Sequence, residues 1–176
     1  MITDFIIKEN AMALYALGDL HLSFSNPEKS QERFGKIWHD HEWKAKKNIE
    51  KLVKPEDTIV LTGDHSWGNN LVQCKRDLDF IEAFPGRKIL LRGNHDHFWP
   101  ANKTQKLNDI FDGRLYFLQN NFYTYKDYAL VGTKGFCFEG PFYVDRRNGM
   151  ITGYDKDAYE HAKVLVEREK KRLMTG

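Results

Sequence analysis

Three short segments each place side chains that can bind a metal directly after a glycine. They are "ALGDLH" at residues 16–21, "LTGDHSW" at 61–67 and "LLRGNHDH" at 90–97. Together they supply carboxylates, imidazoles and an amide oxygen, a donor set that suits Mn²⁺, Fe or Zn²⁺ better than metals that prefer thiolates. Imidazole and carboxyl groups also transfer protons. The spacing therefore predicts a metal centre that carries acid–base chemistry.

Each of these segments ends a short apolar run, which predicts a β-strand buried on both faces of a sheet. Helical patterns at 34–53 and 70–84 separate the three runs, so the expected order is βαβαβ. Parallel strands in such units place their ligands at the carboxyl ends of the strands. The side chains expected to meet at that edge are Asp19, His21, Asp64, Asn94 and His95.

The second half of the chain has a different texture. After a short helix around 102–111, residues 113–136 contain three runs dense in Tyr, Phe, Leu and Val, which predict antiparallel strands of a second sheet. Residues 137–155 are predicted to form a loop, and residues 155–173 an amphipathic helix. No linker divides the sequence, so we expect one domain spanning residues 1–176.

Charge and composition exclude several classes of partner. The chain has 27 Lys and Arg against 25 Asp and Glu, a balance that argues against a dedicated nucleic-acid or membrane-surface binder. The first ten residues lack the pattern of a signal peptide, and no apolar run approaches the roughly 20 residues of a membrane span. We expect a cytoplasmic protein without a membrane partner. Cys74 and Cys137 lie far apart, which predicts buried thiols.

The three segments differ in how strongly they indicate a functional site. A single Gly-Asp after an apolar run is weak evidence, because Asp is common in turns and at helix N-caps. "GNHDH" is stronger, since Asn and two His beside a strand end have no packing role that Leu or Val would not fill better. All three segments occur in order at helix-sized separations, and this conjunction favours a site over turn chemistry.

These segments resemble the motifs of the calcineurin-like metallophosphoesterases, which read D-x-H, then GD, then GNH followed by Asp or Glu. The matching residues are Asp19, Leu20 and His21, then Gly63 and Asp64, then Gly93, Asn94, His95 and Asp96. The resemblance covers residues 13–100 with specific motifs and is looser beyond them. It implies a mixed α/β fold, an αββα sandwich of two packed sheets flanked by helices. It also implies hydrolysis of phosphomonoesters or phosphodiesters at two divalent metal ions by a metal-activated hydroxide.

The resemblance also implies roles for individual residues. Asp19 and His21 would bind the first metal, Asp64 would bridge both metals, and Asn94 would bind the second metal through its amide oxygen. Mn²⁺ is the expected ion, with Fe, Zn²⁺ and Ni²⁺ as alternatives. Phosphoryl transfer at two metal ions requires the ions to lie roughly 3.5 to 4 Å apart, and a bridging carboxylate can hold them at that distance.

The remaining two residues of the third motif are assigned catalytic rather than metal-binding roles by the same resemblance. His95 would stabilise charge or protonate the leaving oxygen of the phosphoester substrate. Asp96 would orient or polarise His95.

The chain departs from the family pattern in its second half. The family's lone His and its GHxH motif are absent, and after His97 only His161 remains, within a helical pattern. The first metal would keep Asp19, His21 and Asp64, whereas the second would keep only Asp64 and Asn94 and bind more weakly. We expect a C-terminally incomplete domain, or one completed by another chain. A noncatalytic subunit that acts through a partner or as a homo-oligomer is the alternative.

Several other side chains keep two interpretations. His65 and His97 are candidates for the rim of the site, whereas an exposed helix is the simpler interpretation of His39 and His41. Three aromatic residues either form an apolar wall for a leaving group or belong to the core: Trp67, Phe98 and Trp99. Three cations either meet a phosphate or are simply solvated: Lys134, Arg146 and Arg147.

Overall fold

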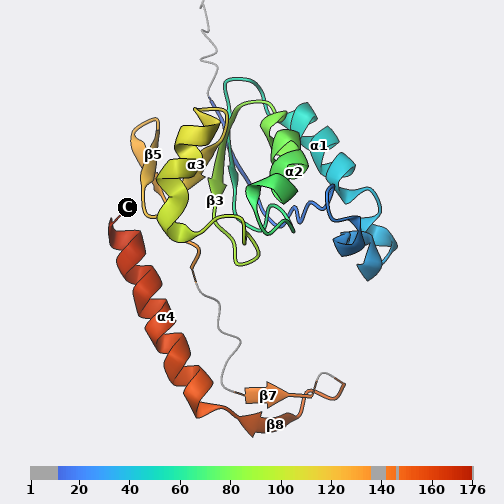
Figure 1. Cartoon of the computed structure of the whole chain (residues 1–176), viewed down its shortest axis with the longest axis vertical. Helices are drawn as coiled ribbons and strands as arrows, with labels where there is room; N and C mark the ends of the chain where they lie inside the picture. The colour runs from blue at the N-terminus through green and yellow to red at the C-terminus, as the bar shows by residue number, and fades with distance from the viewer. Residues whose placement is uncertain (1–11, 136–141, 146, 176) are drawn as a thin grey trace, which may run out of the picture. The chain divides into compact units, whose positions relative to one another are not determined.

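A computed structural model describes residues 12–135, 142–145 and 147–175 of the chain (Figure 1). Its contacts group into two compact units, Met1–Phe117 and Leu118–Gly176, and each unit is described by itself. Cys137 and Arg146 lie outside the described residues. The prediction that the whole chain forms one domain stays a prediction.

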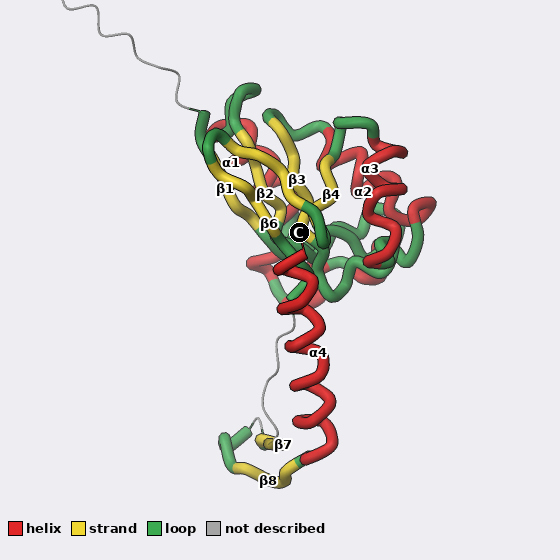
Figure 2. The backbone as a smooth tube through the Cα atoms, turned by 90° about the vertical axis from the view of Figure 1, so that its left-hand side faces the viewer, coloured by secondary structure: helices red, strands yellow, loops and turns green. Residues whose placement is uncertain are grey.

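The first unit is built on a sheet whose strands stand in the order β1-β2-β3-β4 (Figure 2). The strands are β1 (Leu14–Leu17), β2 (Thr58–Leu61), β3 (Arg87–Leu91) and β4 (Tyr116–Leu118). The β1–β2 and β2–β3 pairs are parallel, with Leu17 opposite Leu61 and Leu61 opposite Leu90. This register brings the carboxyl ends of three strands to one edge, as the βαβαβ order predicts.

Helices α1 (His41–Leu52), α2 (Leu71–Glu82) and α3 (Thr104–Phe111) follow the first three strands in turn. Helices α2 and α3 lie on one face of the sheet (Figures 1 and 2). The prediction of α2 is confirmed, and the Asn70 side chain caps it by accepting a hydrogen bond from the Gln73 N–H at 3.1 Å.

The predicted helix over residues 34–53 is wrong in its first third. Three 3₁₀ turns, η1 (Pro27–Lys29), η2 (Gln31–Phe34) and η3 (Lys36–Trp38), precede α1. Gly35 and Asp40 both have positive φ, at 126° and 51°, and an α-helix cannot continue through such residues. Apolar residues of this segment are accordingly exposed in part, and Ile37 is 80% exposed.

The core of the first unit packs the helices against the sheet. Ile59, Leu61 and Leu90 are almost completely buried in the strands, and Leu78 and Ile81 of α2 pack with them. Fully burying one such side chain contributes about 1.5–3 kcal/mol. Further along the chain, the fourth 3₁₀ turn, η4 (Ala101–Lys103), leads into α3.

The second unit contains two antiparallel strand pairs and a long helix. Strands β5 (Phe122–Tyr125) and β6 (Tyr128–Val131) form one hairpin, and β7 (Phe142–Val144) pairs with β8 (Ile151–Tyr154). Helix α4 (Lys156–Thr175) confirms the predicted C-terminal helix. Its buried Glu169 accepts a hydrogen bond from the Thr133 hydroxyl at 2.5 Å and pairs with Arg172 at 2.6 Å. These bonds tie α4 to the chain that follows β6.

The mixed α/β fold with a parallel sheet, a second sheet and flanking helices is confirmed, but two details of the prediction are wrong. The run at 113–119 supplies β4, which joins the first sheet instead of the second. Residues 137–155 are not simply a loop, because the described part of this segment forms β7 and β8. Neither face of β7 or β8 is buried, so their sequences lack the alternation of apolar and polar residues that predicts a strand. Among the described helices, none is long and apolar enough to cross a membrane.

Asp57 fastens the start of the sheet. Its carboxylate accepts the backbone N–H groups of Ala13 at 2.7 Å and Lys54 at 2.8 Å. These bonds hold the pKa of Asp57 below its ordinary value. An acid with a lowered pKa stabilises the fold above its ordinary pKa, and that contribution is lost as the pH falls through the lowered value.

Asp57→Asn should therefore lower the free energy of unfolding at neutral pH, because an amide is a weaker acceptor than a carboxylate and carries no charge. The difference from the unmodified chain should shrink as the pH drops below about 4. Urea titrations across this range measure it, and Glu56→Gln, at an exposed neighbouring site, is the matched control. A difference independent of pH would contradict the assignment.

Candidate metal centre

Alternation along residues 19–22 separates the candidate ligands from the core. Leu20 and Leu22 are 3% and 1% exposed and belong to the hydrophobic core. Asp19 is exposed and His21 is only partly buried, so the buried leucines alternate with the candidate ligands. The D-x-H spacing thus has a structural cause. This is not the alternation of an extended strand, because Asp19 and His21 both have positive φ.

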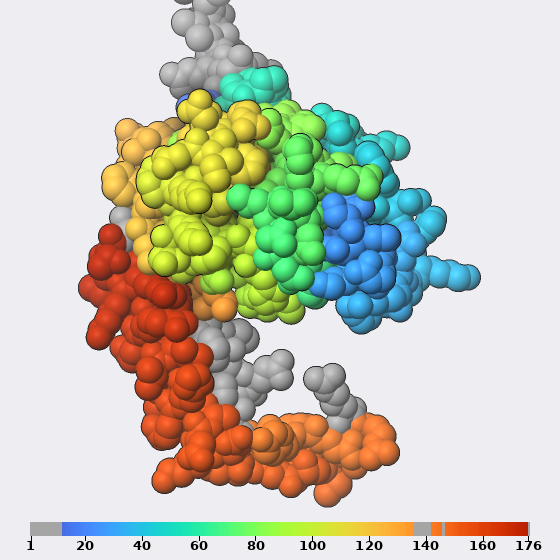
Figure 3. All heavy atoms as spheres, in the orientation of Figure 1, coloured from blue at the N-terminus to red at the C-terminus, as the bar shows by residue number. Residues whose placement is uncertain are grey.

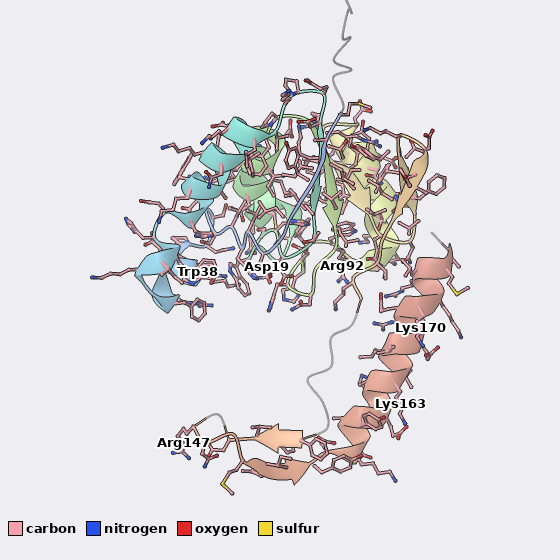
Figure 4. The ribbon with its side chains drawn as sticks, turned by 180° about the vertical axis from the view of Figure 1, so that it is seen from behind. Asp19, Trp38, Arg92, Arg147, Lys163 and Lys170 are labelled. Carbon is pink, nitrogen blue, oxygen red and sulfur yellow. The ribbon has the colours of Figure 1, made fainter. Side chains whose placement is uncertain are left out.

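Backbone hydrogen bonds extend the β1–β2 pairing into the two loops that carry these side chains. The N–H of Asp19 donates to the Gly63 carbonyl at 3.1 Å, and the N–H of His21 donates to the Asp64 carbonyl at 2.8 Å. Leu22 continues the pattern with His65 at 2.9 Å. Main-chain bonds therefore hold the first two motifs in register. Figure 4 shows Asp19 of the first motif and Arg92, which precedes the third motif, at the same edge of the unit.

Three candidate ligands adopt backbone conformations that are unfavourable for their residue type. Asp19, His21 and Asp64 have φ values of 57°, 44° and 54°. A non-glycine residue in this left-handed region costs on the order of 1 kcal/mol or more. These three unfavourable backbone conformations lie close together in the structure, and the surrounding hydrogen bonds must offset their free energy.

The same three residues form a group that could hold a metal ion. Their candidate ligand atoms all lie within 4.8 Å of one another. The His21 Nε2 atom is 3.5 Å from Asp19 Oδ1 and 3.7 Å from Asp64 Oδ2, too far for good hydrogen bonds. Two carboxylates and an imidazole that face one another without bonding fit a shared cation, which would relieve the repulsion between the carboxylates.

The surroundings of His21 favour its metal-binding form. Burial lowers the pKa of His21 below its ordinary value, although the carboxylates of Asp64 and Asp19 oppose the shift. A neutral imidazole is the form that binds metals. The Trp67 ring stacks on His21 at a centroid distance of 4.9 Å and fixes the plane of the imidazole. Of the three aromatic residues with two interpretations, Trp67 thus contacts the site and Trp99 is buried in the core, whereas Phe98 is buried but also lines a surface pocket.

The Asp96 carboxylate joins the second and third motifs through the main chain. It is fully buried and accepts the backbone N–H groups of Asp64 at 3.0 Å, His65 at 2.8 Å and Gly93 at 2.7 Å. Charge-assisted bonds of this kind are roughly twice as strong as neutral ones. One buried side chain therefore sets the position of two neighbouring strand-end loops.

Gly63 and Gly93 allow those loops to approach each other. A Cβ on Gly63 would lie 2.8 Å from the Cα of Gly93, and a Cβ on Gly93 would lie 2.2 Å from the backbone nitrogen of Asp64. Neither neighbour is a flexible side chain that could move away. The glycine in each motif is thus explained by backbone contact, and at Gly63 also by a φ of 115°.

His95 lies beside the three-residue group, and Asn94 is its neighbour in the sequence. The N–H of His95 donates to Asp64 Oδ1 at 2.9 Å, and its ring lies 5.6 Å from the His21 ring and 4.7 Å from the Trp67 ring. Asn94 is exposed. The roles predicted for both residues stay predictions.

The other histidines occupy different environments. His65 is fully buried and bonds through Nε2 to the Leu91 carbonyl at 2.9 Å, which places it behind the site and not at its rim. His97 is exposed and its ring lies 6.2 Å from that of His95. His41 bonds to the Leu20 carbonyl at 2.8 Å, and His161 is exposed on α4. Lys134 and Arg147 belong to the second unit, so nothing places them at the site.

A second group of candidate metal ligands, at Glu32, His39 and Asp40, is exposed. His39 uses one ring nitrogen toward Glu32 at 3.0 Å and the other toward Asp40 at 3.1 Å. Because its two nitrogens point to opposite sides of the ring, the imidazole links two carboxylates as an ion pair. This arrangement is less suited to one ion than the group around Asp64.

Two cations that were not predicted from the sequence lie beside the site. Lys29 donates to the Trp67 carbonyl at 3.2 Å, and both Lys29 and Arg33 lie 5.9 Å from the centre of the Trp67 ring. They come from η1 and η2, a polar segment without periodicity. Their position in the chain could have indicated them, because this segment directly follows the first motif and must start at the same edge of the sheet.

Asp64→Asn should weaken Mn²⁺ binding at least about 100-fold, because the variant loses the charge that holds the ion. Isothermal titration calorimetry measures the change. Asp40→Asn is the matched control from the exposed group and should leave the tight binding intact. Equal losses in the two variants would mean that the ion binds elsewhere.

Gly93→Ala should also weaken Mn²⁺ binding, by roughly tenfold or more, since its Cβ would displace the Asp64 backbone. Gly113→Ala, a glycine substitution in the same unit, is the control, and circular dichroism checks that both variants fold. Unchanged binding in a folded Gly93→Ala protein would refute the close-contact explanation.

Comparisons with known proteins agree with the site. A model of the calcineurin-like phosphoesterase family matches residues 12–172. No curated protein gives a significant match. The solved structure of a protein of unknown function from Aquifex aeolicus is similar at 22% identity and a TM-score of 0.44, over 89% of this chain and 73% of that one. A likeness at that level supports no further conclusion here, but the family match covers nearly all of the chain. The chain belongs to the calcineurin-like phosphoesterase family.

Proposed function

We propose that this chain hydrolyses phosphoesters of small molecules at a divalent metal centre built on Asp19, His21 and Asp64. The observation that carries the proposal is the convergence of these three ligand atoms within 4.8 Å, in a chain of this family. A cation held there would supply Lewis-acid polarisation of the phosphoryl group and lower the pKa of a water molecule. Mn²⁺ is the ion we expect.

A second ion, bridged by Asp64 and bound by Asn94, is part of the proposal. The two Asp64 oxygens are directed differently: Oδ2 faces His21 at 3.7 Å, whereas Oδ1 accepts the His95 N–H at 2.9 Å. That second oxygen lies on the side of the loop that carries Asn94. With fewer described ligands, the second ion should bind more weakly than the first.

His95 is proposed to donate a proton to the leaving oxygen. Its main chain is fixed by the bond to Asp64, and its ring lies next to those of His21 and Trp67. A proton donor must stand within hydrogen-bond reach of the atom it protonates. A phosphoryl group bound beside Asp64 would meet this ring from the exposed side, near the cations Lys29 and Arg33.

Asp96 is proposed to act by positioning the loops. Its polarising action on His95 stays a prediction, but the three bonds to backbone N–H groups support a structural contribution that extends to Asp64 itself. Asp96 would thereby hold the metal ligand and the proton donor at a fixed separation.

The assay uses p-nitrophenyl phosphate and bis(p-nitrophenyl) phosphate with added Mn²⁺. Asp64→Asn should abolish turnover, and His95→Gln should lower kcat by roughly 100-fold or more while Mn²⁺ binding is kept. His39→Ala, an exposed histidine of the same unit, should behave like the unmodified protein. Turnover that survives Asp64→Asn would overturn the proposal.

A noncatalytic role through a second copy or another chain is the alternative. It is favoured by one observation in the second unit, where large apolar side chains of the β7–β8 pair are at least half exposed: Phe142, Tyr143, Val144, Met150, Ile151 and Tyr154. Size-exclusion chromatography with activity assays on each fraction separates the two. An active monomer supports the enzyme, and an inactive oligomer supports the alternative. A cytoplasmic location stays a prediction.

A further inference from the structure

A pocket of about 310 Å³ lies between the starts of α2 and α3. Both helices follow strands of the parallel sheet, so their N-terminal ends lie at the edge where the metal ligands are placed. The two helices run side by side on the face shown in Figure 3. The pocket is therefore on the functional edge of the first unit, although none of its lining residues is a predicted ligand.

One side chain connects this pocket to the candidate active site. His97 lines the pocket, and its ring lies 6.2 Å from the ring of His95. The His95 ring is in turn 5.6 Å from that of His21. A molecule whose phosphoryl group is bound beside His95 can thus place the rest of its structure past His97 and into the pocket.

The lining combines an apolar wall with positive charge. Phe98 and Leu107 are buried and present apolar surface, while Lys103 and Lys106 stand three residues apart on one side of a helical turn. None of the ten lining residues is acidic. Neither ammonium group forms a hydrogen bond or ion pair with another described residue. Two unneutralised cations over an apolar surface favour an amphipathic anion.

The start of α2 adds to this potential. Asn69, Asn70 and Leu71 line the pocket at the N-terminal end of a helix of 12 residues. The partial positive charge of a helix N-terminus also favours anions. This contribution is secondary to the two lysines, but it has the same sign.

We propose that the pocket binds the leaving group of the substrate, and that this group carries an apolar ring and a second anion such as a carboxylate. This inference rests on the proposed phosphoesterase function. It assigns Lys103 and Lys106 to substrate specificity: the phosphoryl group is held at the metal centre, and the remote anion is held by the lysine pair.

The test compares two substrates that differ in one charge, 4-carboxyphenyl phosphate and the compound in which its carboxylate is a methyl ester. In the Lys103→Gln/Lys106→Gln variant, the ratio of kcat/KM for the acid to that for the ester should fall roughly five- to tenfold relative to the unmodified chain. Comparing ratios removes differences in intrinsic reactivity, folding and metal loading. Lys47→Gln/Lys51→Gln, an exposed pair on α1, is the matched control and should leave the ratio unchanged.

A ratio that stays constant in the pocket variant, with both substrates hydrolysed, would overturn the inference and leave the proposed function standing. If neither substrate is hydrolysed although p-nitrophenyl phosphate is, the inference is overturned and the proposed function stands. If p-nitrophenyl phosphate and bis(p-nitrophenyl) phosphate are not hydrolysed either, the proposed function fails, and the pocket is tested by binding alone. In that case 4-hydroxybenzoate should shift the backbone amide NMR signals of Phe98 and Leu107 more than its methyl ester does. Equal or absent shifts would refute the pocket.

Discussion

The buried Asp96 carboxylate is the interaction on which the rest of the site depends. The hydrogen bonds of a sheet stop where its strands end. They do not fix the distance between the loops that follow two neighbouring strands. Asp96 imposes that distance by accepting N–H groups from both loops, two from the chain after β2 and one from the chain after β3. Because a buried carboxylate is stable only when its oxygens are bonded, the loops and the side chain stabilise one another.

This constraint explains how the site tolerates unfavourable backbone geometry. Asp19, His21 and Asp64 all adopt positive φ, which together costs on the order of several kcal/mol. Main-chain bonds between the first two motifs oppose this cost, as do the bonds from the second motif to Asp96 of the third. The result presents an imidazole and two carboxylates to one point, an arrangement that a cation would stabilise and that isolated loops would not keep.

Much of this could be read from the sequence, for identifiable reasons. Continuous apolar runs made β1, β2 and β3 predictable as strands. The expected burial on both faces is wrong for β1, whose residues alternate between exposed and half-buried. The assignment of β4 to the first sheet was not predictable, because a strand's partner is set by tertiary packing. The late start of α1 depends on the left-handed conformation of Asp40, which its residue type does not fix. The exposed β7–β8 pair lacks any burial pattern.

Three of the predicted metal ligands, Asp19, His21 and Asp64, lie together in the structure, whereas the contacts that support them were not predicted. Gly63 and Gly93 directly precede candidate ligands in the sequence, but only the structure shows that they permit the two loops to touch. Lys29 and Arg33 belong to no sequence motif. The pocket beyond His97 is lined by residues from the start of α2, from α3 and from the loop before α3. Contacts of this kind depend on the folded arrangement.

The most direct test of the account is anomalous diffraction from crystals of the chain grown with Mn²⁺. The account predicts a manganese peak within bonding distance, about 2.0–2.3 Å, of Asp19, His21 and Asp64 together. A peak at Glu32, His39 and Asp40 instead, or no peak near Asp64 at saturating Mn²⁺, would contradict it.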